Sequence, residues 1–351
     1  MSDFWRERRV CVTGGGGFLG FHLVRLLREC GARVRTFGLP PGPHHPLHAM
    51  ADVEQHQGDV LDAAAVGRAV ADCAVVFHTA GLVAVWGPAL AKMHAVHVEG
   101  TRNVLAAAAP TARVIHTSSV VAVGARADGT VLDEEAPFNL NGLLVDYVHA
   151  KRAAEEAALE AAGRGRDVVV VNPGYLLGPD DYEGSVMGRF CQRVWKGRAV
   201  VAPPGGLNFV DVRDVALGHL QAAQRGAAGR RYILGNENLP LREFVGRLAA
   251  VAGLRPRWLP RAPYWLMSAV AGLSEARGWW MRREPYPSFQ HVRMNRFTWY
   301  FDCARARREL GYAPRPLQTT LADAYAWHLG HQPWTLRRFN RWWMRPAPAA
   351  A

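Results

Sequence analysis

A tyrosine and a lysine four residues apart are the first side chains in this 351-residue chain that could carry out chemistry. Tyr147 and Lys151 lie in an alanine-rich stretch that is typical of a helix, and their spacing places the phenol and the ammonium on one helix face. A nearby cation favours the phenolate and lowers the pKa of a phenol. The pair is therefore predicted to exchange a proton with an alcohol or a ketone near neutral pH.

Two serines follow a short apolar run that is typical of a buried strand. Ser119 could donate a hydrogen bond to a substrate oxygen and stabilise the charge that develops there during hydride transfer. Ser118 is the less favoured donor and is predicted to contact substrate. Serines at a strand end can also simply satisfy backbone groups, and a Tyr-x-x-x-Lys string alone is common on surfaces. The glycine turn near the start of the chain makes the chemical interpretation the stronger one.

Glycines at three-residue spacing, Gly14, Gly17 and Gly20, lie between a predicted strand at Arg9–Thr13 and a predicted helix. A Cβ atom at these positions would obstruct the tight turn, the approach of a pyrophosphate, or the packing of helix on strand, and the helix N-terminus favours phosphate. A dinucleotide is therefore expected here, with Lys151 holding its nicotinamide ribose. The predicted cofactor contacts of the turn are Gly14, Gly17, Phe18, Leu19 and Gly20.

The preferred nucleotide depends on the end of the second strand. An acid there would bind the ribose hydroxyls of NAD, but the position holds Gly38. A 2′-phosphate would not be repelled, and Arg35, His44 or His45 could contact it, so NADP(H) is expected to be weakly preferred over NAD(H). Asp59, followed by Val60, could receive the adenine amino group, although aspartate is also common in turns.

Strands alternating with helices predict an α/β fold, a Rossmann-type doubly wound parallel sheet. Ligands bind beyond the carboxyl ends of such strands. Residues 1–172 are expected to form the dinucleotide-binding domain, with later strands returning from about 208–235, and 173–333 a smaller, interleaved helix-rich substrate lobe. Residues 334–351 form a basic, tryptophan-rich segment and tail. The predicted strands are Arg9–Thr13, Arg33–Phe37, Ala74–His78, Arg113–Thr117 and Asp167–Val171.

Composition excludes several classes of protein. With 49% hydrophobic and 21% charged residues, the chain is not mainly disordered. No uncharged apolar run approaches the roughly 18 residues of a membrane-spanning helix. The first nine residues lack the apolar core of a secretory signal, so a cytoplasmic location is expected. The five cysteines are scattered singly, which indicates neither a disulfide framework nor a metal site.

Taken together, these motifs resemble the extended short-chain dehydrogenase/reductases, over nearly the whole chain. The resemblance is closest to the branch with 3β-hydroxysteroid dehydrogenases, sterol-4-carboxylate 3-dehydrogenases, dihydroflavonol reductases and bacterial 3-oxoacyl-chain reductases. It implies that Ser119, Tyr147 and Lys151 form the catalytic triad and that His78 is ordinary strand-end structure. Further cofactor contacts implied by it are Thr79, Ala80, Gly81, Asn172 and Pro173. The segments that carry the resemblance are Thr13–Gly20, Val76–Gly81, Val98–Leu105, Thr117–Ser119, Tyr147 with Lys151, Asn172–Gly174 and Asn208–Ala216.

The chain departs from the pattern of this family at two places. His97 stands where the usual Asn-Val-x-Gly-Thr helix start has asparagine, which affects the local hydrogen bonds or water. Gly38 replaces the acid of the NAD-preferring members. Neither change touches the groups that would transfer the proton.

Nucleotide-sugar epimerases and dehydratases share the fold and are the alternative enzymes. Dehydratases of this family have an Asp-Glu pair beside the catalytic hydroxyl, whereas here Ser119 is followed by Val120 and Val121. Sugar-nucleotide members tend to have an arginine for the diphosphate at the position where this chain has Leu207. The expected substrate is therefore a lipophilic alcohol or ketone: a sterol or other polycycle, a prenylated ring, or a long-chain β-keto compound. The predicted substrate contacts are Trp86, Ser118, Tyr175 and Asn208, with further apolar candidates at Val83–Trp86, Tyr175–Leu177, Phe190, Val194 and Trp195.

The net charge of +12 is concentrated at one end of the chain. Residues 255–351 hold 16 arginines, five acids and nine of the 12 tryptophans. Tryptophan interleaved with arginine is typical of segments that lie in a membrane interface, so 258–283 and 334–345 are predicted to bind an anionic membrane surface peripherally.

Other interpretations of this end remain open. The tryptophans could instead pack the small lobe beneath solvated arginines. Nucleic-acid binding is disfavoured because the sequence contains no nucleic-acid-binding motif. A non-catalytic relative that senses NADP(H) is disfavoured because all three residues of the triad are present. A homodimer through helices at 92–109 and 147–162 is also expected.

Overall fold

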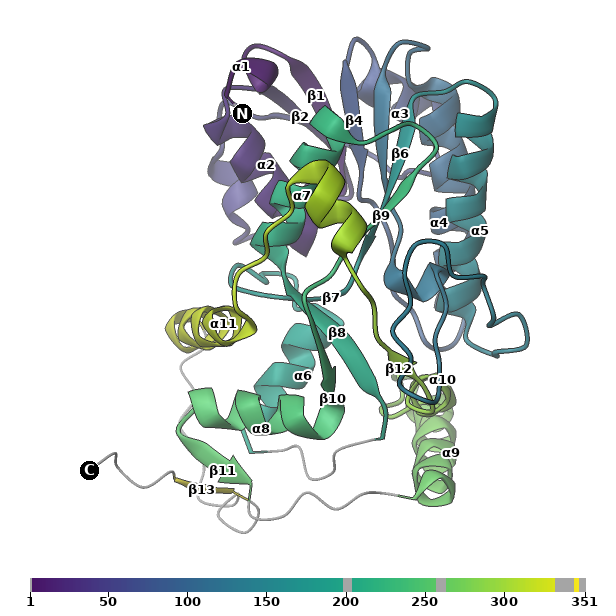
Figure 1. The fold of residues 1–351 in the computed structure, drawn as a ribbon, viewed down its shortest axis with the longest axis vertical. Coiled ribbons are helices and arrows are strands. Elements are labelled where there is room, and N and C mark those ends of the chain that lie inside the picture. The colour runs from purple at the N-terminus through teal and green to yellow at the C-terminus, as the bar shows by residue number, and fades with distance from the viewer. Residues whose placement is uncertain (1, 198–203, 257–262, 332–343, 347–351) are drawn as a thin grey trace.

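The computed structural model describes residues 2–197, 204–256, 263–331 and 344–346 (Figure 1). Its upper part is built on a seven-stranded sheet of order β3-β2-β1-β4-β5-β6-β9, in which all neighbouring strands are parallel. This confirms the predicted Rossmann-type sheet. The strands are β1 (Arg9–Thr13), β2 (Arg33–Gly38), β3 (Glu54–Gln57), β4 (Val75–His78), β5 (Arg113–Thr117), β6 (Val168–Pro173) and β9 (Arg231–Leu234).

Helices cover both faces of this sheet, which is why β4 and β6 are buried along their whole lengths and apolar up to His78 and Asn172 near their ends. One face packs against α2 (Phe18–Glu29) and α7 (Val212–Arg225). The other packs against α3 (Ala63–Val70), α4 (Ala89–Ala107) and α5 (Asp146–Gly163). The strand order reverses between β1 and β4, and a ligand site is expected at their carboxyl ends.

A smaller lobe lies below the carboxyl ends of the strands (Figure 1). Its sheet has the order β10-β8-β12, with β7 paired to β8. Of the segment expected to return to the main domain, α7 and β9 do so, whereas β8 pairs within the lobe. The strands are β7 (Tyr175–Leu177), β8 (Gly206–Asp211), β10 (Glu237–Pro240) and β12 (Thr298–Trp299), and β11 (Leu254–Pro256) pairs separately with β13 (Met344–Pro346).

The lobe helices are α6, α8, α9, α10 and α11. Side chains of α6, α8 and α11 form one apolar core with β8. In contrast, α9 stands at the edge of the lobe beside α10 (Figure 1). Their bounds are Val186–Trp195 (α6), Leu241–Val251 (α8), Tyr264–Met281 (α9), Phe289–Met294 (α10) and Leu317–His331 (α11); short helical segments lie at Ser2–Trp5 (α1), Pro46–Ala49 (η1), Val120–Ala122 (η2) and Ala306–Leu310 (η3).

Candidate active site

The three predicted catalytic side chains meet at the carboxyl end of β5. Ser119 caps the short helix η2 directly after the strand, and its hydroxyl lies within hydrogen-bonding reach of the Tyr147 phenol. Tyr147 is in the first turn of α5, and Lys151 follows one turn later. The Lys151 ammonium donates to the Thr117 carbonyl oxygen at 3.0 Å. The helix therefore presents both groups to the strand end, as their spacing predicts.

Burial controls the ionisation of both groups. It raises the pKa of Tyr147 to about 12, although the hydrogen bond from Ser119 opposes this rise. Burial also lowers the pKa of Lys151 to about 8, with the Glu155 carboxylate acting in the opposite direction. The predicted lowering of the Tyr147 pKa by Lys151 is therefore wrong in this structure. The ammonium is engaged by the Thr117 carbonyl, and removal of the phenol from water is the larger effect.

A buried ion pair fixes the backbone that carries Ser119. Glu155 is fully buried and pairs with Arg231 at 3.0 Å. Its other carboxylate oxygen accepts a hydrogen bond from Asn172 Nδ2 at 2.5 Å, and the same amide nitrogen donates to the Ser119 carbonyl oxygen at 3.0 Å. Asn172, expected beside the cofactor, thus holds the strand ends of β5 and β6 together. Pro173 follows it, buried at the end of β6.

A second hydrogen-bonded chain crosses from β1 to α4 through His78. The Ala80 N–H donates to the Thr13 hydroxyl at 3.2 Å, and that hydroxyl bonds His78 Nδ1 at 2.8 Å. Thr101 donates to the His97 carbonyl at 2.6 Å, so its oxygen accepts from His78 Nε2 at 3.1 Å. His78 is therefore the neutral Nε2–H tautomer. Burial, assisted by the charge of Lys151, lowers its pKa to about 3.

The geometry of the glycine turn fits a dinucleotide. A Cβ atom on Gly14, whose φ is +71°, would lie 2.8 Å from the Cα of Ala80, and one on Gly20 would meet the Gly14 carbonyl oxygen. Gly17 is the N-cap of α2 and offers no side-chain cap, so the N–H groups of Phe18 and Leu19 point to a phosphate position. A hollow of about 290 Å³, open to solvent, adjoins the turn; it is lined by Gly15, Gly16, Thr36–Pro41, Leu47 and Gln55–Gln57.

Two of the side chains expected to contact a 2′-phosphate point elsewhere. Arg35 is buried, donates to the Ala69 and Ala71 carbonyls and pairs with Glu54 at 2.9 Å. These are carbonyls at the C-terminal end of α3, where a cation is stabilised. His45 is buried against Phe21. Both predictions are therefore wrong, whereas Gly38 does line the hollow, as expected.

The remaining predicted cofactor residues lie on loops beside the turn. Asp59 accepts from the Leu61 N–H at 3.1 Å and lies 3.5 Å from the Lys92 ammonium, so its turn role is evident. Val60 is buried beneath α4, where a Cβ on Gly100 would touch it. Thr79 donates to the Thr13 carbonyl at 2.6 Å, and Ala80 and Gly81 continue from it; a Cβ atom on Gly81 would lie 2.7 Å from the His97 ring.

Three predicted substrate residues carry buried polar atoms that lack a hydrogen-bond partner within the described residues. They are the Ser118 hydroxyl, the Tyr175 hydroxyl and the Trp86 indole N–H. Burial raises the pKa of Tyr175, and the neighbouring Tyr147 adds to the rise. Because buried polar groups normally have partners, these atoms are candidates for binding a ligand.

Asn208, the fourth predicted substrate residue, has its amide fully engaged. It is completely buried, donates to Asn238 at 2.7 Å and accepts from the Asn236 N–H at 3.0 Å. A Cβ atom on Gly174 or Gly235 would collide with its amide oxygen. The structure therefore gives Asn208 a role in joining strands of the lobe, and the predicted substrate contact is wrong.

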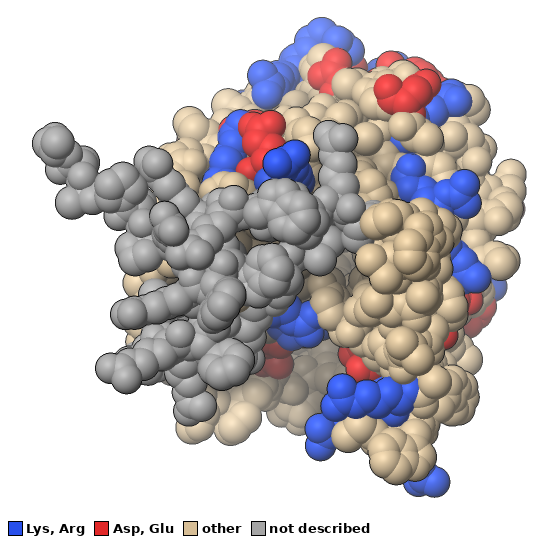
Figure 2. Space-filling view, turned by 90° about the horizontal axis from the view of Figure 1, so that it is seen from below, with Lys and Arg blue, Asp and Glu red and all other residues tan. Residues whose placement is uncertain are grey.

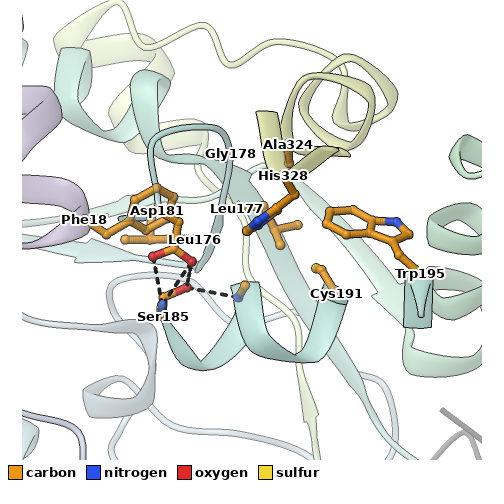
Figure 3. A pocket seen from close by; sticks show the side chains of 11 residues that line it. Phe18, Leu176, Leu177, Gly178, Asp181, Ser185, Cys191, Trp195, Ala324 and His328 are labelled. Atoms are coloured by element: carbon orange, nitrogen blue, oxygen red, sulfur yellow. Dashed lines mark hydrogen bonds between the residues drawn. The ribbon is translucent and has the colours of Figure 1, made fainter. Parts of the chain in front are cut away.

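A second hollow, of about 200 Å³, lies between the glycine turn and the lobe (Figure 3). Leu176, Leu177 and Trp195, three of the predicted apolar residues, line it together with Phe18. Ser185, the N-cap of α6, and Asp181 in the preceding loop face it, and Asp181 is held by hydrogen bonds from the Ser185 N–H at 2.8 and 2.9 Å. Val194, also predicted near the cleft, lies in the lobe core.

A parallel sheet with a glycine turn at its switch point and a Ser-Tyr-Lys cluster at its strand ends defines a nicotinamide-dependent oxidoreductase. The model of the NAD dependent epimerase/dehydratase family matches residues 10–235, and the chain belongs to this family of NAD(P)-dependent enzymes. The predicted extended short-chain dehydrogenase/reductase relationship is confirmed.

Two curated relatives carry names of the predicted branch, and a solved structure shares the fold. A Synechocystis sp. protein provisionally named dihydroflavonol 4-reductase is 35% identical, over 94% of this chain and 97% of its own. Sterol demethylase protein B of Methylococcus capsulatus is 33% identical, over 90% of this chain and 97% of its own. The crystal structure of gox2253 superposes with a TM-score of 0.80 at 31% identity, over 94% of this chain and 100% of that one.

Proposed function

We propose that this protein interconverts a secondary alcohol and a ketone on a lipophilic substrate, using NADP(H) in weak preference to NAD(H). The observation that carries the proposal is the convergence of the Ser119 hydroxyl, the Tyr147 phenol and the Lys151 ammonium at the end of β5. The glycine turn of β1 lies at the same edge of the sheet. With Arg35 and His45 turned away, the preference for NADP(H) rests on Gly38 and on His44, which is exposed.

Each member of the triad has a defined task. The bound nicotinamide supplies or accepts the hydride. Tyr147, protonated at neutral pH because its pKa is about 12, donates its proton to the ketone oxygen in the reducing direction. Ser119 donates a hydrogen bond to the same oxygen and stabilises its developing charge. Lys151, held on the Thr117 carbonyl, binds the nicotinamide ribose.

The surroundings of the triad support a lipophilic substrate. Leu82 and Leu90 pack beside Tyr147 against Met93, and Val120 and Val121, directly after Ser119, are buried in an apolar cluster. The relatives named for a sterol and a dihydroflavonol point to ring ketones. We therefore propose a sterol or other polycycle, a prenylated ring, or a long-chain β-keto compound as the substrate class. A nucleotide-sugar epimerase is the alternative that the family keeps open.

Substrate class is tested with purified protein and NADPH or NADH, by following the absorbance of the reduced nicotinamide. Sterol and acyl ketones should be turned over and UDP-sugars should not. Conversion of UDP-sugars alone to their epimers would establish the epimerase alternative, and it is measured by chromatography of the sugars because epimerisation regenerates the nicotinamide and leaves the absorbance unchanged. Binding of the cofactor with no turnover of either class would indicate a non-catalytic sensor.

The triad is tested by Tyr147→Phe, which should lower turnover by about 10² to 10⁴-fold while cofactor binding is retained. Tyr325→Phe, a half-buried tyrosine on α11, is the matched control and should keep full activity. If Tyr147→Phe is as active as the control, the proposed mechanism is wrong.

A homodimer through α4 and α5, which pack side by side, stays a prediction. The molar mass in solution, measured by light scattering, tests it.

A further inference from the structure

Helix α9 presents its largest apolar side chains to solvent. The exposed fractions of Trp265, Leu273 and Trp280 are 70%, 74% and 86%, and within this helix only Ala271 and Gly278 are buried. No helix in the described part of the chain is long and apolar enough to cross a membrane. In the view from below, uncharged side chains form a continuous area at the place of α9, with basic groups beside it (Figure 2).

The three most exposed of these side chains share one face of the helix. Trp265, Ala269, Leu273 and Trp280 are separated by four, four and seven residues, which is the repeat of a single helical face. The opposite face carries the two buried residues of the helix, Ala271 and Gly278, and a Cβ atom on Gly278 would lie 2.8 Å from the Arg283 carbonyl oxygen. An ordinary surface helix buries its large apolar residues and exposes polar ones. In α9 this order is reversed, as expected when the face binds an apolar partner.

Basic residues surround the exposed face. Arg277, Arg282 and Arg283 lie at the C-terminal end of α9 and are exposed, and none has an ion-pair partner within the described residues. Arg296 adds its guanidinium 5.2 Å from the Tyr264 ring at the other end. Glu275, by contrast, points inward and accepts from the Phe289 N–H at 2.8 Å.

We propose that α9 docks on an anionic lipid bilayer, with the Trp265–Leu273–Trp280 face in the interface and the arginines on lipid headgroups. Tryptophan favours the headgroup region, and arginine is attracted to anionic lipid. A second copy of the chain fits this face less well, since a symmetric contact would bring two sets of unpaired arginines together. The other predicted membrane segment, 334–345, lies almost entirely outside the described residues.

The docking face is connected to the candidate active site. The Trp279 ring packs against Trp86 at 5.0 Å, nearly edge to face. Trp86 lies two residues beyond Ala84, which belongs to the apolar cluster that Tyr147 packs against. We infer that a lipophilic substrate passes from the bilayer to Tyr147 beside this tryptophan pair, an inference that rests on the proposed function.

The docking is tested by co-sedimentation with vesicles of phosphatidylcholine alone and with added phosphatidylglycerol. Wild type should bind the anionic vesicles in a salt-sensitive way. Leu273→Ser with Trp280→Ser should weaken binding at least tenfold, and Arg282→Gln with Arg283→Gln should remove the preference for anionic lipid. Leu329→Ser, which changes an exposed leucine of α11, should have no effect.

Four results would overturn the docking proposal. Wild type could stay in the supernatant with anionic vesicles, or the α11 control could lose as much binding as the α9 variant. Concentration-dependent self-association that the α9 variant abolishes would make a second copy the occupant. Loss of binding on deletion of 334–351, with the α9 variant still bound, would move the contact to that segment.

Activity separates this inference from the proposed function. Ketone in detergent micelles should be reduced equally by wild type and the α9 variant, whereas ketone embedded in anionic vesicles should be reduced at least tenfold more slowly by the variant. Absence of turnover in micelles would refute the proposed function and leave vesicle binding as a separate result. Equal rates on vesicle-embedded ketone would refute the transfer step.

Discussion

Replacement of His78 should change how the stability of the protein depends on pH. The folded protein holds this imidazole neutral, with its pKa lowered to about 3 from 6.5 by burial and by Lys151. The unfolded chain takes up a proton below pH 6.5 and the folded chain does not until near pH 3. The stability that the neutral ring contributes is therefore complete above pH 6.5, falls as the pH is lowered, and stops falling near pH 3.

The size of the effect follows from this interval. One pH unit corresponds to about 1.4 kcal/mol of free energy of unfolding, so wild type should lose about 2 kcal/mol from this group between pH 6.5 and pH 5. His78→Leu removes the titration and two buried hydrogen bonds, to Thr13 and Thr101, which should cost about 2 to 4 kcal/mol at pH 7. The deficit of the variant should then shrink by about 2 kcal/mol at pH 5.

Guanidinium unfolding followed by tryptophan fluorescence at pH 7, 6 and 5 measures this deficit. Thr13→Val is the matched control, because it removes the hydroxyl that bonds His78 Nδ1 and leaves the imidazole in place. Its deficit should be nearly the same at each pH. If the deficit of His78→Leu is also constant from pH 7 to pH 5, the assignment of a neutral, buried His78 is wrong.

Substitutions at Gly38, at Lys151 and at the Arg231–Glu155 pair test the nucleotide site and the buried network. Gly38→Asp should lower the ratio of kcat/KM with NADP(H) to kcat/KM with NAD(H) at least tenfold relative to Gly38→Ala. The alanine variant is the control because it adds the same Cβ atom without the charge. Equal ratios in the two variants would exclude position 38 as the determinant of cofactor preference. Cofactor affinity, measured by fluorescence titration, should weaken as the pH rises through about 8, where Lys151 loses its charge, and Lys151→Met should abolish this dependence. Arg231→Gln leaves Glu155 buried without its ion-pair partner and should lower the free energy of unfolding by about 3 to 5 kcal/mol. The double variant with Glu155→Gln should recover part of this loss. No recovery would show that the two residues do not act as a pair.

The elements that position the candidate site could be predicted because their signals are local. The glycines between β1 and α2, the apolar run of β5 and the four-residue spacing in α5 each specify a structure over a short window. The strand β3 was missed, since its Glu-Gln-His-Gln sequence has no apolar pattern and its side chains are largely exposed.

The errors concern side-chain direction, which depends on residues far away in the chain. Arg35 alternates with Thr36 along β2, and Thr36 lines the nucleotide hollow while Arg35 points to the C-terminal carbonyls of α3. Strand alternation would have indicated one of two faces, but only the end of α3 shows which face holds a buried guanidinium. Asn208 presents the same problem, since its partners lie about thirty and ninety residues further along the chain.

The tryptophan-rich end shows why composition alone could not choose between packing and docking. Trp299 is fully buried in the cluster beside β12, so the packing interpretation holds for that residue. Trp265 and Trp280 differ from it neither in type nor in the charge around them, yet they face solvent. What separates them is the pair Ala271 and Gly278 on the opposite face, because small residues there let α9 lie close to the segment that follows it, at Arg283 and Pro285, and turn its bulky face outward. In this helix the smallest side chains therefore decide where the largest ones are placed, and with them the surface available to a membrane.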